Sequence, residues 1–431
     1  MPTLVELGRL AGRTLGVWWR AWPQVAGWWS LGWAIQLAAL FGSVALGRVW
    51  SDLALLVFVL GPLGLVAGLV LGLHATAPHL QAAPHQLAAR TRREVLTVSL
   101  PAVLGVYALW GLTDLAVEQL FALNYVLYGF AIDSWSVNLT RVWSYLALAA
   151  VAWLVRRGLG LLPAGRSPVR AWAVVVLEAL WVFASFLALA AAGGQVAAWW
   201  RTRAVAVALG QAWQTVLAWL PQWSLWWGVT LPEAVQQAVD LTVTTLVPGF
   251  LDAVALPLVW LALAALVLGW DDVTRGPVAD GDTSRRLTGA AAQYWQRVGV
   301  LRRPLAALTA DLRQKYLPVA HAVRLVWRSG PATMAAYLLL LALLRALGDW
   351  AWVGLRSLLP DWDSNTTELV FQFVAGFGHG LLFTTVLLAG YAVGFDSCLA
   401  RQPETSSTDS PPNQRSDGSS PSGETVTSAT T

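Results

Sequence analysis

Long apolar runs alternate with short polar connectors along most of this chain. About eight of the runs approach the ~20 residues that a helix needs to cross a hydrocarbon core of ~30 Å. The pattern therefore predicts an all-α fold, a polytopic helical membrane protein with about eight transmembrane helices. We expect these spans at about 25–47, 53–73, 95–112, 143–162, 171–192, 253–270, 331–349 and 369–393.

The basic residues fall mostly on alternate connectors. Membrane proteins concentrate Lys and Arg in their cytoplasmic loops, and this bias sets the orientation. We therefore expect both termini in the cytoplasm and a multi-pass insertion in the plasma membrane. The connectors on the expected outer side hold Arg48, Arg141, Arg201, Arg203 and Arg356, and Arg345 lies within an apolar run.

Composition agrees with a membrane location. The chain is 57% hydrophobic and 12% charged, whereas soluble domains are about 25% charged. The net charge of +4 does not indicate a nucleic-acid partner, because the basic residues lie where membrane topology needs them. The preference for Ala, Gly, Val, Leu and Arg is typical of a GC-rich genome and favours a bacterial inner membrane.

The N-terminal segment 1–24 is predicted to be a cytoplasmic amphipathic helix in the membrane interface. Arg9, Arg13 and Arg20 share one helical face, with Leu and Trp opposite, as in interfacial helices. Pro23 is expected to break this helix before the first span. We expect the three arginines to contact the anionic inner leaflet.

A similar unit precedes the seventh predicted span. Both copies read W-R-x-x-P, at 19–23 and 327–331. Either 4–73 and 313–393 are a parallel internal repeat, or the match is coincidence in a chain rich in Trp and Arg. In the second copy, Arg324 and Arg328 are the expected inner-leaflet contacts.

The predicted spans divide the chain into further segments. Residues 25–270 hold six spans, 271–330 a cytoplasmic basic linker and helix, and 331–400 two more spans. Residues 401–431 form a cytoplasmic tail rich in Ser, Thr and Pro, which is expected to be disordered.

The outer segment 193–250, between the fifth and sixth spans, is unusually rich in Trp. We expect helices at 196–220 and 233–250 along the outer interface, where Trp is favoured. Alternatively they are two short or re-entrant spans, which would raise the count to ten. The expected outer-interface residues are Trp199, Trp200, Trp213, Trp219, Trp223, Trp226 and Trp227.

Three ionisable residues within predicted spans are functional candidates, because charged groups inside a membrane are costly. Glu178 is either functional or hydrogen-bonded at a helix contact. Arg345 is functional or simply paired with Asp349, one turn away. His379 is a proton relay or a hydrogen-bonded residue of a close helix pair, and it could face Glu178.

The entry sequence Gly-Arg-Thr-Leu-Gly-Val-Trp-Trp-Arg-Ala-Trp-Pro at 12–23 resembles a class of uncharacterised actinobacterial polytopic membrane proteins. The resemblance implies a membrane location and no particular activity.

Three functions remain open. The first is a transport or export component of the cell envelope, and the second, nearly level with it, is a non-catalytic scaffold or assembly subunit of an envelope complex. An enzyme acting on a lipid-linked substrate ranks behind them, because the acidic residues show no spacing that supports it. We expect no cofactor and no metal site. The expected partners are the lipid bilayer and other membrane or envelope proteins.

Overall fold

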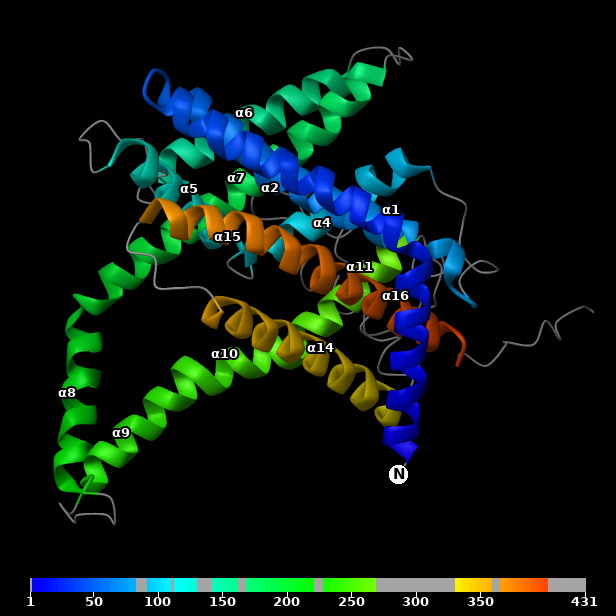
Figure 1. Ribbon diagram of the computed structural model, residues 1–431. Coiled ribbons are helices and arrows are strands. Elements are labelled where there is room, and N and C mark those ends of the chain that lie inside the picture. The colour runs from blue at the N-terminus through cyan, green and yellow to red at the C-terminus, as the bar shows by residue number, and fades with distance from the viewer. Residues whose placement is uncertain are drawn as a thin grey trace, which may run out of the picture.

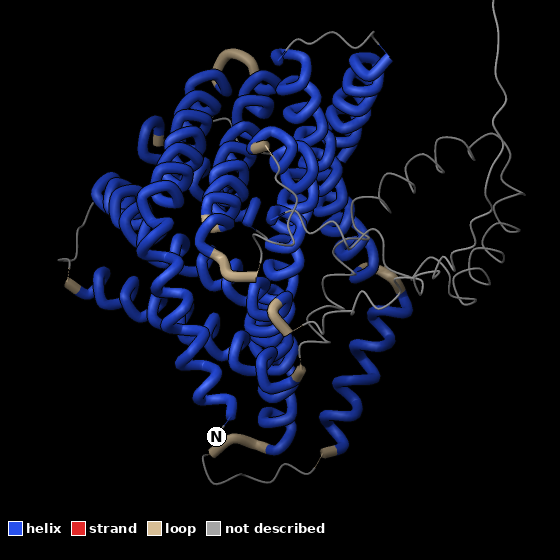
Figure 2. Tube along the Cα trace, turned by 90° about the vertical axis from the view of Figure 1, so that its right-hand side faces the viewer, coloured by secondary structure: helices blue, strands red, loops and turns tan. Residues whose placement is uncertain are grey.

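The computed structural model describes residues 2–82, 91–109, 112–129, 142–161, 168–220, 228–268, 330–358 and 365–401. Within these ranges every regular element is a helix, as predicted, and short loops join the helices (Figure 2). The N-terminal half contains α1 (Pro2–Gly47), α2 (Ser51–Ala75), the short η1 (Ala77–His79), α4 (Arg92–Leu109), α5 (Leu112–Tyr128), α6 (Val142–Leu161) and α7 (Pro168–Arg201). The rest contains α8 (Ala204–Trp219), α9 (Leu231–Leu241), η2 (Thr242–Leu246), α10 (Val247–Phe250), η3 (Leu251–Ala255), α11 (Leu256–Leu268), α14 (Pro331–Ser357), α15 (Asn365–His379), η6 (Gly380–Thr384) and α16 (Thr385–Leu399).

Seven helical segments of the described chain are long and apolar enough to cross a membrane, which indicates a membrane-embedded protein. Seven of the eight predicted spans lie on these segments, and none of the seven extends more than two residues beyond its segment. The remaining one, 95–112, falls mainly on α4, an 18-residue helix whose first turn carries Arg92, Arg93 and Glu94. The seven segments are Thr3–Gly47, Ser51–His79, Val142–Gly160, Trp172–Arg201, Leu231–Leu268, Pro331–Ser357 and Phe371–Leu399.

The first helix does not end where the sequence suggests. Pro23 was expected to separate an interfacial helix from the first span, but α1 runs through Pro23 as one helix of 46 residues. A proline inside a helix removes one backbone hydrogen bond and kinks the helix. In Figure 1 the N-terminal part of α1 is accordingly turned away from the part that runs beside α2. The expected break is therefore a bend.

The most extensive helix contact in the described chain joins α1 to α2. Glycine makes this contact possible, since small residues let helix backbones approach closely. A Cβ on Gly68 would lie 2.6 Å from the Trp28 carbonyl oxygen and 3.1 Å from the Gly32 Cα. A Cβ on Gly32 would lie 2.8 Å from the Gly64 carbonyl oxygen. The two backbones therefore touch along this seam.

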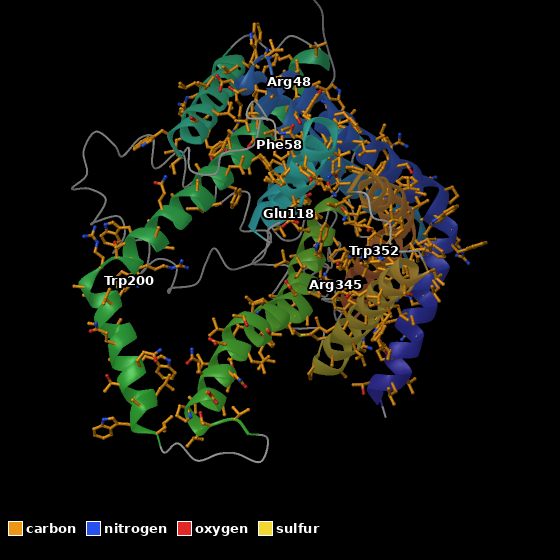
Figure 3. All side chains as sticks on the ribbon, turned by 60° about the vertical axis from the view of Figure 1, so that its left-hand side comes forward. Arg48, Phe58, Glu118, Trp200, Arg345 and Trp352 are labelled. Atoms are coloured by element: carbon orange, nitrogen blue, oxygen red, sulfur yellow. The ribbon has the colours of Figure 1, made fainter. Side chains whose placement is uncertain are left out.

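Around this pair the body of the molecule packs in two apolar clusters. The larger one draws buried side chains from α1, α2, α4, α7, α11, α14 and α16 and includes Phe395 and Leu263. The smaller one joins α1 and α2 to α5, α6 and α7 and includes Phe58 and Phe183. Figure 3 places Phe58 inside the body, among several helices.

A second region projects from the body, and we call it the arm. It comprises the end of α7 from residue 192, then α8, α9, η2, α10 and most of η3, up to residue 253. Most of its described residues are exposed. In Figure 1, α8 lies at the far edge of the molecule and the α9–α10 run returns toward α14.

The arm differs in part from the interface helices expected at 196–220 and 233–250. A separate α8 covers most of the first expected helix, but α7 contributes its beginning, up to Arg201. The second expected helix is not a separate element. It is part of one helical run that extends from Leu231 to Leu268, through the π-helical turns η2 and η3. At 1.5 Å per residue this run extends for about 57 Å, well beyond a ~30 Å hydrocarbon core.

Candidate functional site

The first candidate, Glu178, is buried on α7 and bonded to the neighbouring helix. Its Oε2 lies 2.7 Å from Nε of Arg156, on α6. The two helices pack along their lengths, because a six-residue connection at 162–167 joins them. Removing a carboxylate from water costs free energy, and the opposite charge of the guanidinium offsets part of that cost. The sequence alone does not pair these residues, since Arg156 falls at the polar end of its predicted span.

Arg345 has different partners from the expected one. Instead of pairing with Asp349, its Nη1 donates to the Asp252 carbonyl oxygen at 2.7 Å, and its Nη2 donates to the Tyr391 hydroxyl at 3.3 Å. Asp252 belongs to η3, a π-helical turn. The guanidinium therefore joins α14 to the root of the arm, and Figure 3 shows Arg345 beside the helix that leads into the arm.

The third candidate, His379, is the last residue of α15. Its Nε2 lies 3.0 Å from the Gly348 carbonyl oxygen of α14. The ring stacks on Phe383 at 4.8 Å between centroids and meets Trp352 edge-on at 5.5 Å. A Cβ on Gly348 would lie 3.2 Å from the Phe383 ring and 3.4 Å from His379 Nε2, so both rings pack closely on the backbone of α14 at this glycine. A close helix contact of this kind was one of the two expectations.

These three residues do not form one site. Arg345 and the partner of His379 both lie on α14, three residues apart, whereas Glu178 contacts α6. The hypothesised Glu178–His379 pair is not formed among the described residues: the Glu178 carboxylate contacts Arg156, and the His379 imidazole contacts the Gly348 carbonyl. The described part of the chain also contains no group of three or more His, Cys, Asp or Glu residues arranged to hold a metal ion.

The arginines expected at the inner leaflet separate into two groups. Arg9 and Arg20 are exposed on α1, but Arg13 turns inward and bonds Asp396 and Ser397 at the end of α16. Arg324 and Arg328 lie outside the described residues. Sequence reasoning missed Asp396, a completely buried acid three residues beyond the predicted end of the last span. An acid beside an apolar run was the available signal.

The expected outer-interface tryptophans lie on the arm where they are described. Trp199 and Trp200 end α7, and Trp213 and Trp219 lie on α8, all with exposed rings. The guanidinium of Arg203 lies 4.2 Å from the Trp199 ring centroid, a favourable cation–π contact. Figure 3 shows Trp200 on the arm, near the bend between α7 and α8. Trp223, Trp226 and Trp227 lie outside the described residues.

The arm also exposes many apolar side chains. Its exposed large apolar side chains include Val196, Leu209, Val243, Leu246, Val247 and Phe250. Glycines on the arm are open too: among the described residues nothing lies within 4 Å of a Cβ built at Gly193, Gly194 or Gly249. In the α1–α2 pair the glycines contact a neighbouring helix, whereas these glycines of the arm contact no other described helix.

Comparison with known proteins gives no family assignment for this arrangement: the chain matches no protein-family model, no curated protein and no solved structure.

Proposed function

We propose that this protein is a non-catalytic membrane scaffold or assembly subunit, and that its arm binds a membrane-spanning helix of another envelope protein. The observation that carries the proposal is the unpartnered apolar surface of the arm, described above. From 236 to 253 every residue of the returning helix is exposed. Its exposed apolar side chains, among them Val243, Leu246 and Phe250, require an apolar environment.

Small residues favour a protein helix over lipid alone as the neighbour of this surface. Helices associate within membranes mainly by close packing at Gly and Ala. The end of α7 reads Ala-Ala-Ala-Gly-Gly at 190–194, and Gly249 lies on the opposite limb of the arm. Gly193, Gly194 and Gly249 are all exposed. The same chain uses glycine for its own tightest helix contact, between α1 and α2.

The position of the arm supports the same function. The three intramembrane polar candidates are bonded to neighbouring helices in the body, so they stabilise helix contacts. Arg345 anchors the root of the arm to α14 through the Asp252 carbonyl. The body then serves as a platform that holds the arm outward.

Site-specific photo-crosslinking in native membranes tests this proposal. A photoreactive amino acid replaces Leu246 on the arm or, as the matched control, Leu347 on α14, whose exposed fractions are 57% and 59%. We expect one protein adduct of discrete mass at position 246 and none at position 347. The adduct should disappear when Gly249→Leu fills the neighbouring surface.

Three outcomes would count against the arm as a docking site for another protein. Lipid adducts alone at both positions would assign the arm to the bilayer. An adduct of twice the chain mass would assign it to a second copy of this protein. A protein adduct that persists in Gly249→Leu would mean that the contact is unspecific.

A second candidate function is transport or export, and the π-helical turns favour it. The turn η6 begins directly after His379, and η3 supplies the carbonyl that binds Arg345. Such turns occur often at functional sites. Glu178→Gln and His379→Ala should both impair complementation of a deletion strain if the polar residues serve transport. Full complementation by both variants would remove the basis for this function.

A further inference from the structure

A buried polar centre joins three helices and a loop at the end of the molecule where the first and last helices meet. Asp396, near the end of α16, is completely buried. Its carboxylate accepts hydrogen bonds from the guanidinium of Arg13 and from the backbone N–H groups of Gln81 and Ala82, the latter two at 3.2 Å and 2.8 Å. One side chain therefore binds α1 and the segment that follows η1.

Neighbouring residues extend the same centre. The other Nη of Arg13 donates to the Ser397 hydroxyl at 3.0 Å. Arg401 donates to Glu6 of α1 at 2.7 Å and also to Thr333 of α14. Further along α1, Trp18 Nε1 donates to the Thr385 hydroxyl at 2.9 Å. The N-terminal part of α1 is thus bound in antiparallel fashion to α16 and to Arg401, two residues past the end of α16.

The element held in this way has a hinge. Pro23 lies inside α1, and Figure 1 shows the bend between the N-terminal part of the helix and the part that packs on α2. A proline weakens the helix at its own position, since one backbone hydrogen bond is missing. Residues 2–22 can therefore move as a unit about Pro23 when their contacts with α16 are released.

We propose that Asp396 and Arg13 form a latch that holds residues 2–22 of α1 and the segment 80–82 against the end of α16. The ion pair governs the latch because an ionised carboxylate without a partner is strongly unfavourable in a buried position. The Arg401–Glu6 pair is more exposed and contributes less. The Arg13 side chain keeps 17% of its surface exposed, so the latch lies at the edge of the body, where water can reach it on opening.

The chain contains its own reporter for the latch. Cys398 is the single cysteine; it lies two residues from Asp396 and is 5% exposed. N-ethylmaleimide reacts with a buried thiol only through local opening, so the labelling rate measures the population of the open state. The full-length protein in membranes can be used without any added cysteine.

The decisive comparison is between two arginines on the same face of α1. Arg13→Met removes the ion pair, while Arg9→Met removes an exposed arginine one turn earlier. Because the buried carboxylate loses its partner, we expect Arg13→Met to raise the labelling rate of Cys398 about tenfold or more. Arg9→Met should label at the wild-type rate.

A neutralising second substitution separates the ion pair from general packing. With Asp396→Asn added to Arg13→Met, the side-chain amide oxygen at this position could still accept from the Ala82 amide, the shorter of the two backbone bonds, and no buried charge would remain. The double variant should therefore label more slowly than Arg13→Met alone. Equal labelling of Arg13→Met, Arg9→Met and wild type would overturn the latch, as would failure of the second substitution to lower the rate.

A more conservative variant covers the case in which Arg13→Met does not fold. Arg13→Lys keeps the charge, but a single ammonium cannot reproduce the forked contact with both Asp396 and Ser397. It should therefore give a smaller rise in labelling, and an unchanged rate would equally overturn the latch.

Discussion

The α1–α2 pair and the arm are both rich in apolar residues, yet only the pair forms a close contact between helices. In the pair, Gly32, Gly64 and Gly68 bring two backbones into contact. In the arm, Gly193 and Gly194 face open space and the large apolar side chains are exposed. Hydrophobicity therefore brings a helix into an apolar environment but does not select its neighbour. In membranes that selection depends on shape and on polar contacts.

The largest loss of stability is expected from a substitution in the α1–α2 pair. In Gly68→Leu the new Cβ would meet backbone on both sides, at Trp28 and Gly32, so no side-chain rearrangement can relieve the clash. We expect the free energy of unfolding to fall by about 3 kcal/mol or more, at the upper end of overpacking costs. The thermal unfolding midpoint of the purified protein measures this. Gly194→Leu is the matched control, and an equal loss there would abolish the distinction between the two regions.

A somewhat smaller effect is expected from the ion pair that joins α6 to α7 within the body. Glu178→Ala leaves Arg156 without its carboxylate in a partly buried position. The cost should be about 2 kcal/mol, since the arginine remains partly exposed. Thermal unfolding of Arg156→Met and of the double variant with Glu178→Ala completes a double-mutant cycle. Additive effects would mean that the pair contributes nothing of its own.

At the boundary between the two regions, Arg345→Met should loosen the root of the arm. The substitution removes the bonds to the Asp252 carbonyl and the Tyr391 hydroxyl, together worth about 1–2 kcal/mol. Hydrogen exchange should become faster in residues 251–255 and stay unchanged in α2. Uniformly faster exchange in both segments would indicate that Arg345 stabilises the whole fold.

The smallest effect is expected in the arm itself. Gly193→Ala meets open space and should stabilise the helix locally by about 0.5–1 kcal/mol, because glycine is entropically costly in a helix. Hydrogen exchange at the end of α7 should slow slightly, with no change in the unfolding midpoint of the body. A drop in that midpoint would mean that the arm packs on the body.

Part of the site could be read from the sequence and part could not. The helical class followed from run length, and Glu178, Arg345 and His379 stood out as ionisable residues in apolar runs. Their partners did not follow. Arg345 was expected to bind Asp349, four residues away, but binds Asp252 and Tyr391 from distant elements. Local spacing predicts contacts within one helix, whereas these contacts depend on how helices cross.

The sequence by itself determined the helical fold, the apolar segments and the richness of the segment 193–250 in Trp, because these depend on composition and period along a single chain. The tertiary structure decided that Pro23 bends α1 without ending it, that Arg13 binds Asp396 while Arg9 stays exposed, and that the end of α7 projects with α8 and α9 as an arm. Each of these depends on which distant helix lies opposite. The hydropathy of a single apolar run does not specify which helix packs against it. Close packing and buried polar bonds between helices decide this.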